Sequence, residues 1–323
     1  MDLRSIPRFV CALGFGLAGT AGCSIHLGLA PQPGPLQETV VAGDAGPKFA
    51  LIELRGVITE SAESSLFAPD RPSHVSLTLE ALDRAAKDEV AGLLLSIHSP
   101  GGTATASDTL FHEIERWKAE NEKPVLAFLD GLATSGGYYV AMGADHILAH
   151  PTTVTGSVGV VMVGVNVSGL MQKVGIADQT LTSGSFKDAG SPLRPMRPAE
   201  RAQLQSVIDD LFARFRSVVV ERRPELDPDA LAELSDGRVY SAPQALEGNL
   251  IDAIGYFDDA IDWLESQAGV TESRIVTYHP RGDFRSNVYA SAPVQTVQID
   301  LLGTFLPRLA PGFYYIWRPL LAD

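Results

Sequence analysis

Ser135 lies where a serine hydroxyl could act as a nucleophile. The apolar run Pro124–Leu129 predicts a buried strand and Tyr138–Met142 predicts the start of a helix, so Ser135 falls in the turn between them. A tight turn lifts a side chain out of the sheet, and the two glycines that follow let another backbone approach closely. Unpaired N–H groups at a helix N-terminus can bind a developing negative charge. A plainer interpretation, that Ser135 only caps the helix, fits the same residues.

A second glycine turn follows the strand predicted over Val90–Ile97 and contains Gly101 and Gly102. Parallel strands that lie side by side end at the same edge of a sheet, where α/β proteins usually hold their sites. N–H groups of Gly101 or Gly102, and of Gly136, could therefore converge on one oxygen and form an oxyanion hole. The preceding Pro100 has no N–H to donate. The glycines would equally suit a simple turn.

Lys187 is the best candidate for the base that a serine nucleophile needs. It lies in a Gly/Ser loop beside Phe186, whereas the other lysines lie on the first predicted strand, on helices or in polar turns. A lysine accepts a proton only when it is neutral, and removal from water favours that state. The carboxylate of Asp188 would oppose this, unless the two neighbouring side chains point to opposite faces of an extended segment.

Histidines offer an alternative base, in a Ser-His-Asp arrangement with Asp130. His98 and His150 are the candidates by position, but we expect them to be strand-end or surface side chains. The histidines show no metal-ligand spacing, so no metal site is expected. No cofactor is expected either.

Strands and helices must alternate to place these residues together. Helices are predicted over Thr78–Ala86, around Leu110–Trp117, from Pro198 onward and over Asp258–Ser266. This alternation predicts an α/β fold with helices outside a largely parallel sheet. The predicted strands are Lys48–Ile58, Val90–Ile97, Pro124–Leu129, Ile147–Ala149, Val158–Val163, Gly175–Leu181 and Arg274–Tyr278.

Composition excludes several functions. The formal net charge is −14 and no basic patch stands out, so nucleic acid is not an expected partner. The two cysteines, Cys11 and Cys23, both lie near the N-terminus, which leaves no disulfide framework or cysteine-based zinc site in the body of the protein.

The N-terminus is typical of an exported protein. Residues 1–22 carry two arginines and a short apolar run, as in a signal peptide. Small residues then precede Cys23, which resembles the lipobox of bacterial lipoproteins, with Thr20 where an aliphatic residue is usual. We therefore expect lipidation of Cys23 and anchoring to the extracytoplasmic side of a membrane. Ordinary signal cleavage and an uncleaved short anchor are the alternatives, and whether the membrane is inner or outer stays open.

The motifs together resemble those of the signal peptide peptidase A (protease IV) family of bacterial serine peptidases, in its short, single-repeat form. The resemblance spans about Phe49–Leu264. The motifs that carry it are Ser99-Pro-Gly-Gly, Ala133-Thr-Ser-Gly-Gly-Tyr-Tyr, Thr155-Gly-Ser-Val-Gly-Val, Ser183-Gly-Ser-Phe-Lys-Asp and Gly237-Arg-Val-Tyr with Ala245, Gly248 and Leu250-Ile-Asp.

This resemblance implies a ClpP/crotonase-like spiral of ββα units and a Ser-Lys dyad, with Ser135 as nucleophile and Lys187 as general base. It also implies a homo-oligomeric ring in which neighbouring protomers can complete a site. The implied substrates are signal-peptide remnants and other unfolded peptides. A crotonase-like acyl-transfer enzyme, a non-catalytic membrane scaffold and a Clp-type protease with a histidine base are the competing hypotheses.

The expected organisation is one catalytic domain between short flanking segments. A signal peptide covers residues 1–22, a lipid-anchored tether 23–47, the peptidase domain 48–268 and a C-terminal extension 269–323. The apolar and aromatic end of that extension contains three prolines, which make it a poor membrane helix. It could contact a neighbouring subunit, touch the membrane or occupy a peptide groove, and we favour the subunit contact.

Overall fold

The structure is a computed structural model, and it describes residues 34–61, 63–65, 68–226, 228–280, 287 and 312–317. The predicted signal peptide, Cys23 and the first part of the predicted tether lie outside these residues. No helix among the described residues is long and apolar enough to cross a membrane.

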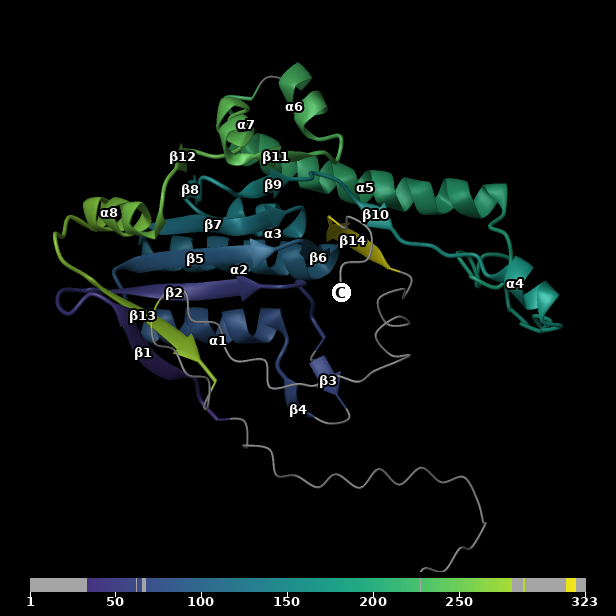
Figure 1. Ribbon diagram of the computed structural model, residues 1–323, viewed down its shortest axis with the longest axis horizontal. Helices are drawn as coiled ribbons and strands as arrows, with labels where there is room; N and C mark the ends of the chain where they lie inside the picture. The colour runs from purple at the N-terminus through teal and green to yellow at the C-terminus, as the bar shows by residue number, and fades with distance from the viewer. Residues whose placement is uncertain are drawn as a thin grey trace, which may run out of the picture. The chain divides into compact units, whose positions relative to one another are not determined.

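A nine-stranded sheet forms the centre of the molecule (Figure 1). Its main strand order is β1-β13-β2-β5-β7-β8-β12, while β9 pairs with the C-terminal end of β7 and, on its other side, with β11. Pairing is parallel except between β1 and β13 and between β9 and β11. The strands are β1 (Gln37–Ala42), β2 (Lys48–Arg55), β5 (Gly92–Ser99), β7 (Val125–Thr134), β8 (His146–Ala149), β9 (Val154–Gly156), β11 (Val239–Ser241), β12 (Ala253–Ile254) and β13 (Arg274–His279).

Two smaller sheets complete the strands. One has the order β10-β14-β6 and the other is the hairpin β3-β4. Their bounds are β3 (Glu63–Ser65), β4 (Ala68–Arg71), β6 (Gly101–Thr103), β10 (Val161–Met162) and β14 (Phe313–Ile316). The helices are α1 (His74–Lys87), α2 (Ala104–Asn121), α3 (Gly136–Ala141), α4 (Ser168–Lys173), α5 (Pro198–Arg222), α6 (Pro228–Leu234), α7 (Ala242–Glu247) and α8 (Phe257–Ala268).

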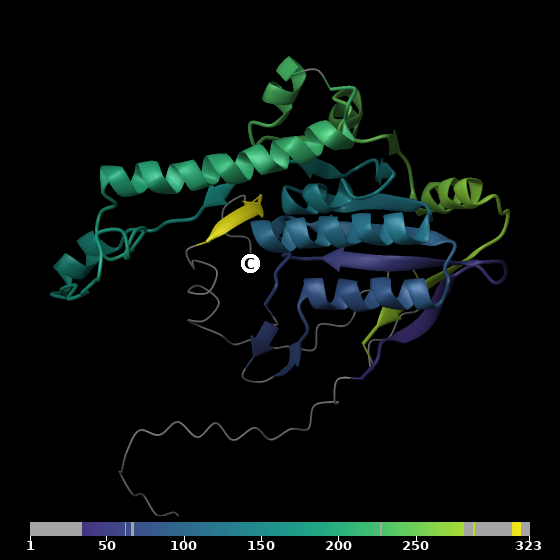
Figure 2. The same ribbon diagram turned by 180° about the vertical axis from the view of Figure 1, so that it is seen from behind.

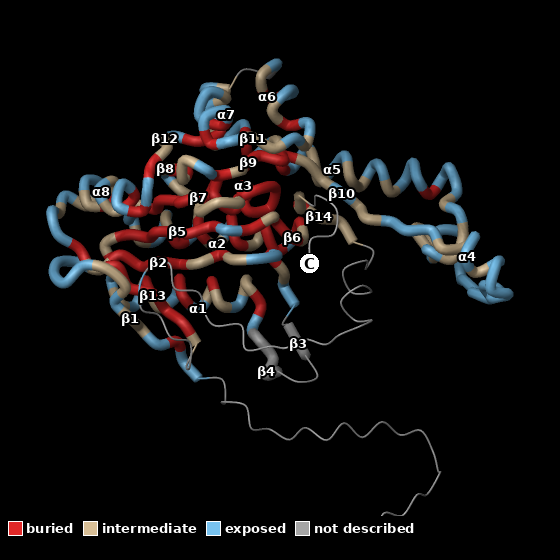
Figure 3. The backbone as a smooth tube through the Cα atoms, viewed as in Figure 1, coloured by how far each residue is buried: buried red, intermediate tan, exposed pale blue. Residues whose placement is uncertain are grey.

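Apolar side chains cover both faces of the central sheet, as the near-continuous apolar strands require. In β5, Leu93, Leu95 and Ile97 pack on the face that α1, α2, α3 and the C-terminal part of α5 cover, while Leu94 packs on the α8 face. Figure 2 shows α1 and α2 over the first of these faces, and Figure 3 shows the central strands as almost wholly buried. The α/β fold class predicted from the alternation of elements is confirmed.

Two segments predicted to lie outside the peptidase domain contribute strands to its sheet. β1 falls within the predicted tether and pairs with β13, and β13 falls within the predicted C-terminal extension and pairs parallel with β2. The predicted boundaries at residues 48 and 268 therefore cut through one sheet. The tether was inferred from prolines and a missing hydrophobic period, but an edge strand such as β1 needs neither a continuous apolar run nor two buried faces.

One predicted strand is absent. Residues 176–183, which cover most of the strand predicted over Gly175–Leu181, have no regular structure and their side chains are exposed. Leu181, for example, is 97% exposed. The apolar residues that suggested a strand lie in the segment between β10 and α5, which includes α4 and extends beyond the sheet along the N-terminal part of α5 (Figures 1 and 2).

Candidate active site

Ser135 lies between β7 and α3, in the turn that the sequence predicts. Its backbone has φ +52° and ψ −113°, a combination that residues with a side chain rarely adopt, and its side chain makes no capping hydrogen bond to α3. Only 1% of the residue is exposed. The capping interpretation is therefore wrong, and the strained turn fits a residue whose side-chain direction matters.

The other motifs hold this turn in place. The Ser135 N–H donates to the carbonyl of Gly156 at 2.7 Å, and the Thr155 hydroxyl donates to the Ala133 carbonyl at 2.6 Å. Strand β9 therefore acts as a clamp on the end of β7. Tyr240 in β11 pairs with Thr155 on the other side of β9, so the sequence motif around residue 240 supports the turn rather than contributing reacting groups.

The glycines of β6 and α3 approach one another closely. A Cβ atom added to Gly101 would lie 2.7 Å from the nitrogen of Gly136, and one added to Gly136 would lie 3.0 Å from the nitrogen of Gly102. Side chains at these positions would fill the space between the backbones. The approach itself therefore requires glycine, and Gly101 also has φ +99°.

The three glycines are not equivalent as donors. The Gly101 N–H donates to Ser99 Oγ at 3.0 Å, and the Ser99 hydroxyl itself donates to the carbonyl of Gly56 at 2.6 Å. Gly101 is thus already engaged within its own turn. Of the three glycines predicted to form an oxyanion hole, Gly102 and Gly136 are the two whose N–H groups are not engaged by Ser99.

Strand β14 from the C-terminus lies against these glycines. It is the middle strand between β10 and β6, antiparallel to both, with Tyr315 opposite Gly102. Trp317 N–H donates to the Pro100 carbonyl at 2.8 Å, so the alternation of antiparallel pairs places Tyr315 and Gly102 at a hydrogen-bonded position. The Tyr315 carbonyl oxygen lies 2.9 Å from where a Gly136 Cβ would stand, which puts a peptide carbonyl at the convergence of the glycines.

The ring of Tyr315 fills an aromatic pocket beside this site. It stacks on Tyr139 with ring centroids 5.2 Å apart and lies 4.9 Å from the ring of Phe215, while Phe111 packs edge-on against Tyr139. The Tyr315 hydroxyl donates to the carbonyl of Leu211 at 2.8 Å. Burial raises the pKa of Tyr315 to about 12, so the phenol stays neutral and the pocket holds a large, mainly apolar side chain.

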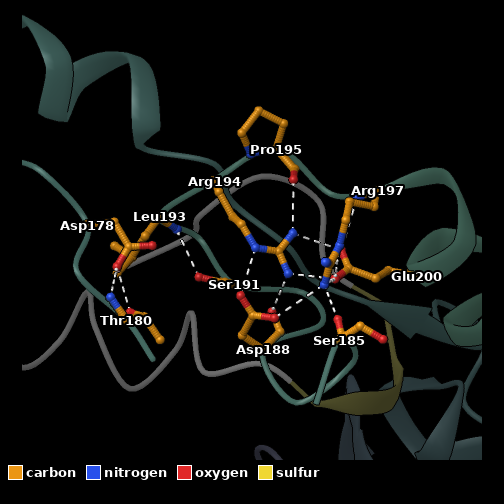
Figure 4. A network of polar contacts seen from close by, with 10 residues as sticks. All are labelled: Asp178, Thr180, Ser185, Asp188, Ser191, Leu193, Arg194, Pro195, Arg197 and Glu200. Atoms are coloured by element: carbon orange, nitrogen blue, oxygen red, sulfur yellow. Dashed lines mark hydrogen bonds and ion pairs between the residues drawn. The ribbon is translucent and has the colours of Figure 1, made fainter. Parts of the chain in front are cut away.

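The structure does not bring Lys187 to Ser135 within one chain. Lys187 is exposed in the turns between α4 and α5, and α4 lies far from α3 in both views of the molecule (Figures 1 and 2). The neighbouring Asp188 carboxylate binds Arg194 and Arg197, which in turn bind Glu200 (Figure 4). The serine and the lysine of the predicted dyad thus lie on different parts of the protomer.

The histidine alternative gains no support from the described residues. The Nδ1 atom of His98 contacts the backbone carbonyl of Asp130, while the Asp130 carboxylate pairs with Arg55 at 3.2 Å. His150 bonds to Thr152. No histidine among the described residues contacts Ser135, and no cluster of three metal-ligating side chains occurs in the same part of the chain.

Two features of the site were missed or left open by the sequence. Ser99 appeared only as part of a turn motif, although its hydroxyl fixes the turn by three hydrogen bonds. The sequence leaves the aromatic C-terminus open among a subunit contact, the membrane and a peptide groove, and it does not indicate the pairing of β14 with β6 in the same chain. Its aromatic content was the available signal, but aromatic residues suit a subunit contact equally well.

Comparison with known proteins also indicates a peptidase. Residues 118–271 match the model of peptidase family S49. The chain is 36% identical to a protein named as a signal peptide peptidase SppA from Enterococcus faecium over 243 residues, which are 75% of this chain and 70% of that protein. It is 35% identical to the chloroplastic serine protease SPPA of Arabidopsis thaliana over 185 residues, 57% of this chain and 27% of that protein.

Among solved structures, a point mutant of the membrane-bound stomatin-specific protease 1510-N aligns with 68% of this chain and 84% of its own. The TM-score is 0.41 and the sequence identity is 16%. The family assignment therefore rests on the sequence relatives and on the site, and the chain belongs to peptidase family S49 as a serine peptidase of the signal peptide peptidase A type.

Proposed function

We propose that the protein is a membrane-bound endopeptidase in which Ser135 attacks extended apolar peptides and Lys187 is the general base. The observation that carries the proposal is the position of β14. It adds a strand to β6 and directs the Tyr315 carbonyl at the glycine amides beside Ser135. A substrate bound in the same way would present its scissile carbonyl there, since strand addition is a common mode of peptide recognition.

The chemistry would run as follows. Neutral Lys187 Nζ takes the proton of Ser135 Oγ, and Oγ attacks the carbonyl carbon while the N–H groups of Gly102 and Gly136 bind the oxyanion. The lysine ammonium then protonates the leaving amine as the C–N bond breaks. Water, deprotonated by the lysine, hydrolyses the acyl-enzyme and restores the free serine.

The proposed substrates are remnants of cleaved signal peptides and other unfolded peptides. The ring of Tyr315 packs against Tyr139 and Phe215, and Phe111 packs behind Tyr139, so this position suits a large apolar residue directly before the scissile bond. Signal peptides are rich in such residues. The relative from Enterococcus faecium is itself named as a signal peptide peptidase.

We further propose that Lys187 serves the Ser135 of a neighbouring protomer in a homo-oligomeric ring. Lys187 is exposed on its own chain, and the segment around it exposes many large apolar side chains. Such a concentration of exposed apolar surface marks a protein contact. The residues are Val165 (44% exposed), Leu170 (63%), Val174 (60%), Ile176 (57%), Leu181 (97%) and Phe186 (49%).

A serine-reactive phosphonate probe tests whether the site is catalytic. We expect covalent labelling of the wild-type protein and loss of both labelling and peptide hydrolysis in Ser135→Ala. If the protein were a non-catalytic scaffold, the wild type would be neither labelled by the probe nor able to hydrolyse the peptide. A crotonase-like acyl-transfer enzyme would leave an apolar fluorogenic peptide uncleaved. The control is Ser157→Ala, which removes a buried hydroxyl at the neighbouring turn and should leave labelling intact.

The proposed membrane attachment depends on Cys23. Two or more acyl chains hold a protein stably on a bilayer, whereas a cleaved and unlipidated chain is released. We expect Cys23→Ser to move the protein from the membrane pellet to the soluble fraction, with Cys11→Ser as a control that changes a cysteine within the predicted signal peptide. Unchanged pelleting of Cys23→Ser after a high-salt wash would rule out the lipid anchor.

A further inference from the structure

The side chains of Asp188, Arg194, Arg197 and Glu200 form a closed charged network (Figure 4), and Lys187 directly precedes Asp188 in the chain. The centre of this network is the carboxylate of Glu200 in the first turn of α5, of which only 1% is exposed. Glu200 accepts hydrogen bonds from Arg194 Nη1 at 2.9 Å, Arg197 Nε at 2.7 Å and the Arg197 backbone N–H at 2.9 Å. The last of these is a capping-box bond, so the buried charge is fully engaged and anchors both arginines to the start of α5.

The two arginines hold the chain on both sides of Lys187. Arg194 donates through Nε to Asp188 Oδ2 at 2.7 Å and through Nη2 to the Asp188 carbonyl at 3.2 Å. Arg197 contacts the Ser185 carbonyl and lies 3.4 Å from Asp188 Oδ1. The backbone two residues before the lysine and the residue directly after it are thus both tied to α5.

These contacts also fix the position of the Asp188 carboxylate. Its carboxylate is engaged by Arg194 and Arg197, and Lys187 Nζ makes no ion pair within the described residues. Hydrogen bonds from Arg194 lower the pKa of Asp188 and of Glu200, so both are ionised at neutral pH. Asp178 is the other charged group near this cluster, and its carboxylate is held by Thr180 at 2.6 Å.

We propose that Arg194 is a positioning residue for the general base, because it holds the Asp188 carboxylate away from Lys187. This inference rests on the proposed function, in which Lys187 must be neutral to accept the serine proton. A carboxylate beside the ammonium would stabilise the protonated lysine, so that at neutral pH little neutral lysine would be present to accept a proton. The merely structural alternative is that the network only secures the start of α5.

The pH profile of kcat/KM for the full-length protein separates the two roles. Arg194→Gln removes the closer cation from Asp188 and leaves it only the longer contact to Arg197. The acidic limb is then expected to move to higher pH by about one unit, since a nearby opposite charge moves a titration by that much or more. On the acidic limb this amounts to a loss of about tenfold at a given pH, recovered on the plateau at higher pH. Adding Asp188→Asn to Arg194→Gln should return the limb to its wild-type position.

Three further variants complete the experiment. Asp188→Asn alone should leave the limb in place, since its charge is already compensated. Arg194→Lys keeps one charged contact and should shift the limb only part of the way, which keeps the test usable if Arg194→Gln fails to fold. Arg201→Gln removes a charge from the next turn of α5 without touching this network, and its profile should match the wild type.

The outcomes are distinct. An unshifted limb in folded Arg194→Gln, or a shifted limb that Asp188→Asn does not restore, overturns the inference while leaving the proposed dyad intact. Near-normal activity of Lys187→Ala instead defeats the dyad itself, whatever the Arg194 variants show. Loss of activity at all pH values, with no movement of the limb, would assign the network a structural role only.

Discussion

Co-expressed Ser135→Ala and Lys187→Ala proteins are expected to hydrolyse peptide although each variant alone is inactive. Each single change removes a member of the proposed dyad and should lower kcat by at least about 10³-fold, as for members of other catalytic units. Lys187 lies exposed and apart from Ser135 on its own chain. In a mixed ring, a Lys187→Ala protomer keeps its serine and can receive the lysine of a Ser135→Ala neighbour.

The size of the recovery can be estimated. If the two variants assemble at random in equal amounts, a site needs an intact serine in one protomer and an intact lysine in the adjacent one. About a quarter of the sites then meet both conditions, so about a quarter of the wild-type rate should return. Two different affinity tags allow mixed oligomers to be isolated and their peptide hydrolysis measured.

The control pairs Ser135→Ala with the double variant Ser135→Ala/Lys187→Ala, which has no intact serine and should stay inactive. If mixed oligomers form but remain as inactive as the single variants, each site is self-contained and Lys187 does not act across the interface. A single Lys187→Ala variant with near-normal turnover would instead show that another group is the base.

Removal of β14 is expected to increase the hydrolysis of added peptides. The strand fills the position between β6 and β10 that an extended substrate would take, with Tyr315 in the aromatic pocket. A segment tethered to its own site competes at an effective concentration of about millimolar. Ending the chain after residue 311 should therefore raise kcat/KM for a short apolar peptide by about 10- to 100-fold.

The opposite result has an equally clear meaning. If β14 were only part of the core, its loss would expose the rings of Tyr139 and Phe215 and lower stability, since leaving a large side chain unburied costs about 2–3 kcal/mol. Truncation would then lower the melting temperature and fail to raise activity. Both quantities are measured on the same variant, by thermal unfolding and by peptide hydrolysis.

A peptide added in trans provides the matched control. The hexapeptide with the sequence of residues 312–317, Gly-Phe-Tyr-Tyr-Ile-Trp, should inhibit the truncated protein. The same peptide with alanine at the position of Tyr315 should inhibit at least about tenfold more weakly, because it leaves the aromatic pocket unfilled. Equal inhibition by both peptides would show that this pocket does not select the residue.

The local features of the site could be predicted from the residues alone. The strand-turn-helix around Ser135 and the glycine turn at Gly101 follow from apolar runs that end in glycines, and this chemistry acts between residues close in the chain. The alternation of strands and helices determined the fold class in the same way. The motif order also sufficed for the family, which a relative 36% identical over 243 aligned residues confirms.

The contacts between distant segments could not be predicted and became visible only in the folded chain. It joins the Ser99 hydroxyl to the Gly56 carbonyl, pairs β14 with β6, and holds Lys187 apart from Ser135 and near Arg194. The reason is physical. An apolar strand pattern states that a segment will pair but not with which edge, and a charged side chain is equally suited to solvent or to a network. Partner choice depends on which edges and charges remain free after the core has formed, and no local sequence pattern records that.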